Sequence, residues 1–263
     1  MPNSPSTPDN DSIQQVLVTP RHLAGGGDPA WVTVPLHRAC GWSHGHDPLM
    51  PRVILSSPDQ KAVLRLDPTP DGPWWVLQHA PVGGQRAWSA SFGARTPVEI
   101  IAAVTDALTD PAPATAPAPD PYEPLRQAGW GEGRDDGGLA SPDGIAHVEH
   151  FVHGATDCWF VKAAISEDPE GQIWRAYFSG ETPPHLVAAF TRALSDQTPL
   201  SRDPHPLRVS AYGRRNIQLS YRQLPPDEVA FALERRVKAL ADRSSRPAPA
   251  PRSPNVPPPR RTR

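Results

Sequence analysis

The sequence predicts an α+β fold of two tandem copies of one unit, a helix, a four-stranded antiparallel meander and a second helix, plus a C-terminal hairpin and helix. Six motifs recur in the same order, offset by 84 to 89 residues, which indicates duplication. Between these motifs, apolar residues first alternate with a period of two, as in strands, and then repeat every three to four residues, as in helices. The repeated motifs are Pro-Leu leading to Gly-Trp (35–42, 124–130), Ser-Pro-Asp (57–59, 141–143), Trp (75, 159), Trp-x-Ala-x-Phe (88–92, 174–178), Thr-Pro (96–97, 182–183) and Ala-Leu (107–108, 193–194).

Proline-rich stretches set the predicted domain boundaries. Proline accounts for 36 residues of the 263, well above its ordinary share of roughly 5%. Stretches rich in Pro, Ala and Ser have too little apolar surface to offset the entropy of ordering. The predicted parts are a disordered N-terminus (1–14), a first repeat domain (15–110), a Pro/Ala linker (111–121), a second repeat domain (122–200), a C-terminal hairpin and helix (201–242) and a disordered Arg/Pro tail (243–263).

The strands of each copy follow from turn chemistry and alternation. Each Ser-Pro-Asp, followed by Gln60 or Gly144, suits a type I turn, because Pro presets φ and Asp favours the third position. In the last strand of each copy, Trp, Ala and Phe at a period of two share one buried face. The predicted strands are 52–56, 61–66, 74–79 and 86–92 in the first copy and 147–152, 158–163 and 173–178 in the second.

Helix-capping residues follow the last strand. Thr96, Pro97 and Glu99 match a capping box, and the apolar stripe that follows them in copy one returns in copy two. Asp28-Pro29 is expected to cap the helix that ends at Gly41. Outside the paired motifs, the sequence predicts a leading strand (16–19), a hairpin (208–211 with 216–221) and a helix (227–241).

These motifs resemble the SPDY domain family. The resemblance rests on Leu-Ala-Gly-Gly-Gly-Asp at 23–28, the Gly-Trp and Ser-Pro-Asp motifs, the Trp-x-Ala-x-Phe strand and the Thr-Pro cap, and it covers roughly residues 16–200. Copy two lacks the glycine-rich segment and the leading strand. The family is actinobacterial, usually carries two copies and has no assigned function. The resemblance therefore implies the fold, and it implies no catalytic or binding residue.

Charge is unevenly distributed along the chain. The net charge is −2, but residues 243–263 hold six Arg and no acid, so the remainder has 20 basic and 28 acidic residues and a net charge of −8. An acidic body disfavours a large phosphate-binding face. The tail is interpreted mainly as a solvated segment with weak, non-specific contacts to nucleic acid as the alternative. Its candidate contact residues are Arg246, Arg252, Arg260, Arg261 and Arg263.

Histidine clusters are the strongest metal-site candidates. The 44–47 stretch holds two His and an Asp, but the matching stretch of copy two has no His, which favours a solvated loop. His147, His150 and His153 are expected on a strand, where the middle one points away from the other two. We predict no metal site and no cofactor.

Other catalytic patterns are also weak. Gly25–Gly27 has no following Gly-Lys-Ser/Thr, so a turn is favoured over a phosphate loop. Cys40 and Cys158 form no C-x-x-C pair, and we interpret both as buried apolar residues. No G-x-S-x-G elbow is present. We predict that the chain is not an enzyme.

The tryptophans and the whole composition favour a binding protein. Trp75, Trp88, Trp159 and Trp174 recur at matched positions and are expected in the core, whereas Trp74 must face the other way and is the candidate contact residue. The predicted function is a non-catalytic binding or interaction module with a protein partner. The alternative is a nucleic-acid-associated protein that uses a duplicated sheet face or the tail. With no signal peptide and no apolar membrane span, the expected location is the cytoplasm, with no membrane partner.

Overall fold

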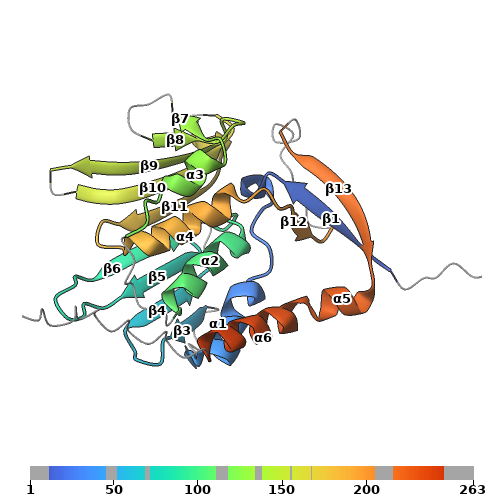
Figure 1. The fold of residues 1–263 in the computed structure, drawn as a ribbon, viewed down its shortest axis with the longest axis horizontal. Helices are drawn as coiled ribbons and strands as arrows, with labels where there is room; N and C mark the ends of the chain where they lie inside the picture. Colours follow the sequence, from blue (N-terminus) through green and yellow to red (C-terminus); the bar gives the residue numbers. More distant parts are fainter. Residues whose placement is uncertain are drawn as a thin grey trace, which may run out of the picture.

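The computed structural model describes residues 12–45, 52–68, 72–110, 118–133, 138–154, 156–166, 168–204 and 216–245. It contains helices and antiparallel sheets, so the predicted α+β class is confirmed. A large sheet carries a layer of helices, and a small second sheet lies beside it (Figure 1). In the described part of the chain, no helix is long and apolar enough to cross a membrane.

The large sheet is built from strands of both repeats. Its order is β2-β3-β4-β5-β6-β11-β10-β9-β8-β7, so the two repeats meet where β6 pairs with β11. The strands of repeat one are β2 (Ser43–Gly45), β3 (Val53–Ser56), β4 (Ala62–Leu66), β5 (Trp75–His79) and β6 (Trp88–Phe92). The strands of repeat two are β7 (Gly131–Glu132), β8 (Gly138–Ala140), β9 (Ala146–His153), β10 (Thr156–Ala164) and β11 (Gln172–Ser179).

The prediction of four strands per repeat was wrong by one strand. Each repeat begins its part of the sheet with a short edge strand directly after Gly-Trp, β2 in repeat one and β7 in repeat two. These strands have 3 and 2 residues, which is too short for an alternating pattern to be recognised.

Four helices cover one face of the large sheet (Figure 1). They are α1 (Ala30–Cys40) and α2 (Val98–Leu108) from repeat one, and α3 (Glu123–Gln127) and α4 (Pro184–Ser195) from repeat two. Their apolar sides meet the inward side chains of the strands in one continuous core, which includes Trp75, Trp88 and Trp174 as predicted. Trp159 is only partly buried and packs against the edge of this core. Because the core spans both repeats, neither buries its apolar face without the other.

The predicted capping box at α2 was wrong. The helix begins after Pro97, no side chain caps it, and the buried hydroxyl of Thr96 has no hydrogen-bond partner. Glu99 instead pairs with Arg202, and the first N–H of the helix donates to the carbonyl of Gly26 at 2.7 Å. Tertiary partners therefore replace the local cap.

The small sheet joins both ends of the chain. Its order is β12-β1-β13, and it has its own core of Val16, Val18, Ala24 and Leu200. The leading strand predicted at 16–19 is therefore part of a separate sheet. One arm of the predicted hairpin, 208–211, lies outside the described residues, and the other arm pairs with β1. The strands are β1 (Ile13–Thr19), β12 (Leu200–Arg202) and β13 (Gln218–Leu224).

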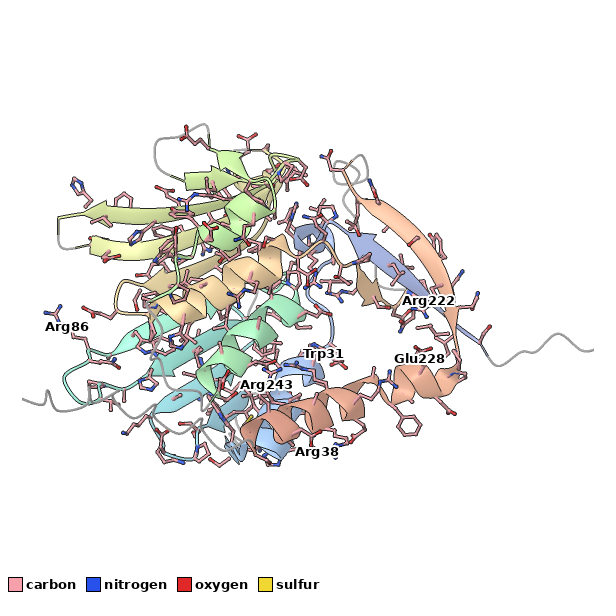
Figure 2. All side chains as sticks on the ribbon, viewed as in Figure 1. Trp31, Arg38, Arg86, Arg222, Glu228 and Arg243 are labelled. Atoms are coloured by element: carbon pink, nitrogen blue, oxygen red, sulfur yellow. The ribbon has the colours of Figure 1, made fainter. Side chains whose placement is uncertain are left out.

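The C-terminal helix returns to repeat one. The helix predicted at 227–241 is two helices, α5 (Pro226–Ala230) and α6 (Ala232–Ser244), which meet at Phe231. Helix α6 runs along α1 (Figure 1), burying Val237 and Leu240. Arg38 on α1 pairs with Glu234 on α6 near the solvent, and Figure 2 shows Arg38 at this helix pair.

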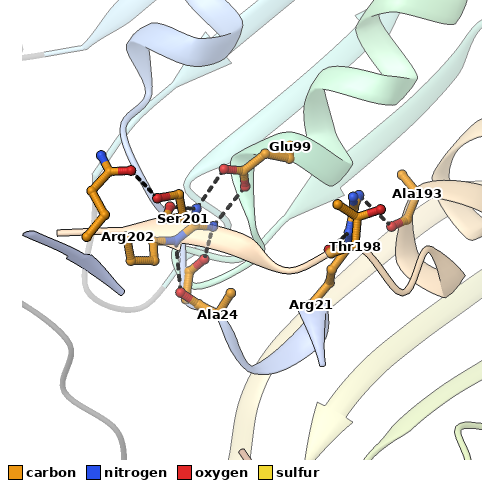
Figure 3. A network of polar contacts seen from close by, with 9 residues as sticks. Arg21, Ala24, Glu99, Ala193, Thr198, Ser201 and Arg202 are labelled. Carbon is orange, nitrogen blue, oxygen red and sulfur yellow. Dashed lines mark hydrogen bonds and ion pairs between the residues drawn. The ribbon is translucent and has the colours of Figure 1, made fainter. Parts of the chain in front are cut away.

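Two arginines fasten the segment that follows β1. This segment contains the short 3-10 helix η1 (Arg21–Leu23), and another such turn, η2 (Pro169–Gly171), precedes β11. Arg21 donates to the carbonyls of Thr198 and Ala193, and Arg202 donates to the carbonyls of Ala24 and Gly25 (Figure 3). The segment is therefore held by the end of α4 and by residues that follow it in the sequence.

Candidate binding surface

One face of the large sheet carries no helix among the described residues. Side chains along each strand alternate between the buried, helix-covered side and this second side. Helices α1 to α4 lie together on the first side (Figure 1). We call the second side the open face. Its central line is the β6–β11 pair, where Ser91 lies opposite Tyr177.

Three aromatic side chains gather on the open face of repeat two. Phe151, Phe160 and Tyr177 lie on β9, β10 and β11, with ring centroids 6.5 Å apart for the first pair and 5.3 Å for the second. Phe151 is 39% exposed and Phe160 is 46% exposed. Large apolar side chains grouped at the surface are uncommon unless they contact something. These rings therefore mark a candidate binding surface.

Two cations lie directly beside these rings. Lys162 and Arg175 are opposite one another across β10 and β11, and both are exposed. Neither has an ion-pair partner among the described residues. Like charges directly opposite in a sheet are destabilising, so this arrangement opposes folding stability. One acid, Glu149, lies opposite Phe160 on the far strand and offsets part of the charge.

Repeat one has none of these side chains at the matched positions. The Trp-x-Ala-x-Phe anchors align Arg175 with Ser89 and Tyr177 with Ser91. The Trp75 and Trp159 anchors align Phe160 and Lys162 with a valine and a glutamine on β5, Val76 and Gln78. The same sheet therefore forms without rings or cations at these positions. We call Phe160, Lys162, Arg175 and Tyr177 the surface quartet.

The chain matches one known family. The SPDY family, a domain of unknown function (DUF317), matches residues 56–114 and 140–200. Two segments match the same family model, which is consistent with two tandem SPDY copies. Each match begins at the Ser-Pro-Asp turn and extends past the last helix of its repeat. No curated protein and no solved structure matches the chain.

The Ser-Pro-Asp turn of each SPDY repeat has a structural role. The buried serine hydroxyl donates to the Asp carboxylate and accepts from the N–H of an alanine at 2.9 Å, Ala62 or Ala146. The residue after the turn has a positive φ, 59° at Gln60 and 71° at Gly144. This hydrogen bonding aligns the two strands that leave the turn, and it agrees with the turn predicted from the sequence.

The turn of the second SPDY repeat has an additional partner. Nε2 of the buried His22 lies 2.8 Å from Oδ2 of Asp143, and the His22 carbonyl accepts from Trp174 Nε1. Burial by itself raises the pKa of Asp143. The hydrogen bond and charge of His22, with the hydroxyl of Ser141 and the N–H of Ile145, outweigh burial and lower this pKa from 3.8 to about 2. The contact joins the N-terminal segment to repeat two.

We expect Asp143→Asn to destabilise the protein near neutral pH and to have little effect in strong acid. The lowered pKa of Asp143 in the folded protein gives stability that is fully present above about pH 3.8 and is lost as the pH falls towards about 2. One pKa unit corresponds to about 1.4 kcal/mol, and partial exposure reduces the expected loss to about 1–2 kcal/mol. Urea unfolding at decreasing pH measures this.

The control for this prediction is Asp59→Asn, the matched change in repeat one. Asp59 accepts from its turn serine at 2.6 Å, but His22 contacts Asp143 and not Asp59, so the stability lost in Asp59→Asn should depend less on pH. A loss from Asp143→Asn that stays constant down to about pH 2 would contradict the assignment.

The sequence-derived contact residues are mostly away from the surface quartet. Trp74 precedes β5, is partly buried and packs against the main core, and its contact role stays a prediction. The five candidate tail arginines lie outside the described residues, as do His46 and Asp47. His150 stacks on Trp159 with centroids 4.3 Å apart and bonds Asp157 at 2.8 Å, so it has a packing role.

The other chemical candidates also have structural partners. Within the described ranges, no three His, Cys, Asp or Glu residues lie close enough to hold a metal ion. Cys158 is 1% exposed, and burial raises the pKa of its thiol, which disfavours the nucleophilic form. A Cβ on Gly26 would lie 2.5 Å from the Ala94 carbonyl oxygen, so this glycine is required for packing.

A broad hollow on the helix side, of about 1030 Å³, lies between α2, α3 and α4 and reaches α6. Several of the residues that line the hollow are alanines, and some of its charged residues form ion pairs with one another. Asp106 pairs with Arg236, and Asp196 pairs with Arg21. These pairs leave the hollow without a convergent unpaired set of reactive groups such as an active site uses.

Sequence reasoning missed the surface quartet. The signal was present in the alignment of the repeats, as four outward positions at which repeat two has rings or cations and repeat one has smaller or neutral residues. The positions that the repeats share form turns and core, and the candidate contact residues lie at positions where the repeats differ.

Proposed function

We propose that this chain is a non-catalytic binding module whose contact surface is the open face of its second repeat. In this proposal two copies of a helix–meander–helix unit have diverged, with repeat one completing the sheet and core and repeat two carrying the contact residues. The surface quartet is the observation that supports it. Its exposed rings and the repulsion between its two cations oppose stability, and repeat one has neither rings nor cations at the matched positions.

A binding role is favoured over catalysis by the kind of side chains present. The quartet has an amine, a guanidinium, a phenol and a phenyl ring on the face of the sheet that carries no described helix. Catalytic sites are generally concave and bring an acid, base or nucleophile together with a group that positions it. Rings and cations on a flat face are typical of recognition surfaces.

The test transfers the residues of repeat one onto repeat two. The grafted variant carries Phe160→Val, Lys162→Gln, Arg175→Ser and Tyr177→Ser in the full chain. Wild type and variant are immobilised, exposed to an extract of the native host and compared by mass spectrometry and nucleic-acid sequencing. We expect components that the wild type retains to be lost from the grafted variant.

A matched control changes the same face in repeat one, with Val76→Thr and Gln78→Ala on β5, which does not pair with repeat two. It should retain what the wild type retains, because those positions lack rings and cations. The four introduced side chains already occupy the equivalent strand positions of repeat one, and removing the cation pair relieves a repulsion, so the variant should unfold at a midpoint no lower than that of the wild type. Identical retention by wild type and grafted variant would refute the proposal.

A further inference from the structure

Resting on the proposed function, we infer that the open face of repeat two binds single-stranded nucleic acid, with bases against Phe160 and Tyr177 and phosphates against Lys162 and Arg175. The inference deepens the proposal by naming the partner class. It uses the surface quartet and is independent of the arginine tail.

The rings are placed as a stacking platform for bases. Phe160 and Tyr177 are neighbours on adjacent strands, with centroids 5.3 Å apart and ring planes inclined by 55°. Phe151 continues the row on β9. Aromatic side chains on the face of a sheet are a common way to stack unpaired bases, and the contact tolerates any base.

The cations are placed to accept the phosphates. Lys162 lies two residues from Phe160 on β10, and Arg175 lies two residues from Tyr177 on β11, so each ring has a cation on the same face. The two cations are direct cross-strand neighbours, and an anion between them would remove their repulsion. Glu149, opposite Phe160 on β9, is a nearby acid on the same face, and it offsets only part of the charge of the two cations.

The geometry favours a single strand over a duplex. In a duplex the bases are stacked on one another and cannot lie on protein rings. A duplex also needs cations along a long face, whereas repeat one has Gln78 and Ser89 where repeat two has Lys162 and Arg175. A protein partner could use the same rings, but it would need acidic side chains matched to Lys162 and Arg175, whereas every nucleotide of a single strand carries a phosphate.

The experiment measures binding of fluorescein-labelled oligothymidine and oligouridine of about 12 nucleotides to the full chain by anisotropy, across a salt series. Phe160→Val with Tyr177→Ser should weaken binding by about tenfold to hundredfold, as expected when one or two stacked bases are lost. Lys162→Gln with Arg175→Ser should reduce the slope of log K against log salt by about 1.4, since each phosphate contact contributes about 0.7.

The controls separate this inference from the proposed function. Val76→Thr with Gln78→Ala in repeat one should bind as the wild type does, and an unlabelled duplex of the same sequence should compete poorly. Unchanged oligonucleotide binding in both quartet variants would refute the inference, because the binding would then come from elsewhere in the chain. If the grafted variant still loses a protein from the extract, the proposed function stands and its partner is a protein. If it loses nothing, both proposals fail.

Discussion

Trp174→Ala is expected to lower the free energy of unfolding by about 3–5 kcal/mol, which is a large share of the 5–15 kcal/mol typical of a domain. Trp174 is 2% exposed, and its ring lies against Phe190 with centroids 6.5 Å apart. Its Nε1 also donates to the His22 carbonyl at 2.8 Å, so the alanine variant leaves both a cavity and an unpaired buried carbonyl. Urea unfolding followed by circular dichroism measures the loss.

Two comparisons separate the contributions of ring and hydrogen bond. Trp174→Phe keeps most of the volume and removes the N–H, so it should cost less than the alanine variant. Phe160→Ala removes an exposed ring and should change stability by no more than about 0.5 kcal/mol.

Because one core spans both repeats, Trp174→Ala should unfold in a single transition. A loss below about 1 kcal/mol would contradict the core position of this ring.

The repeated core could be predicted because its signals are local. Trp-x-Ala-x-Phe alternates at the period of a strand, and the Ser-Pro-Asp turn specifies a backbone shape within four residues. Both features recur at matched positions, so each supports the other. The structure accordingly has a strand at each Trp-x-Ala-x-Phe, β6 and β11, and buries Trp88 and Trp174.

Features decided by distant partners could not be predicted in this way. Glu99 satisfies the local pattern of a capping box, but Arg202, 103 residues later, takes its carboxylate. The strand predicted at 216–221 pairs with β1, which lies about 200 residues earlier in the sequence, and the predicted hairpin arm at 208–211 lies outside the described residues. At Glu99 a local preference was overridden by a tertiary contact, and at β13 sequence spacing gave no sign of the distant partner strand.

The candidate site was missed for a different reason. Apolar rings on a strand are ordinarily interpreted as core, and Phe160 is adjacent in sequence to the partly buried Trp159. Alternation predicts that neighbours point to opposite sides, but it does not say which side a helix will cover. Only the layer of helices on one face of the sheet shows that Phe160 and Tyr177 lie on the other.

The ion pair of Arg202 and Glu99 is the strongest polar link between the small sheet and the repeats (Figure 3). Two nearly parallel hydrogen bonds of 2.6 and 2.8 Å join the guanidinium to the carboxylate, and the side chains are 9% and 21% exposed. The same guanidinium donates to the carbonyls of Ala24 and Gly25 at 3.0 and 3.1 Å. It therefore links β12, the start of α2 and the segment after β1.

We expect Arg202→Ala to cost about 2–4 kcal/mol, because Glu99 is left as a partly buried charge without its partner and its partial exposure reduces the penalty of a fully buried charge. Arg202→Met with Glu99→Leu should cost less than Arg202→Ala alone, since removing both charges avoids that penalty. Arg86→Ala is the matched surface control, because its pair with Glu181 is 3.3 Å long and its own side chain is 82% exposed. Urea unfolding gives the three losses, and hydrogen exchange should show β1 and β12 losing protection first in Arg202→Ala. Equal stability of Arg202→Ala and Arg86→Ala would show that the pair does not hold the small sheet to the repeats.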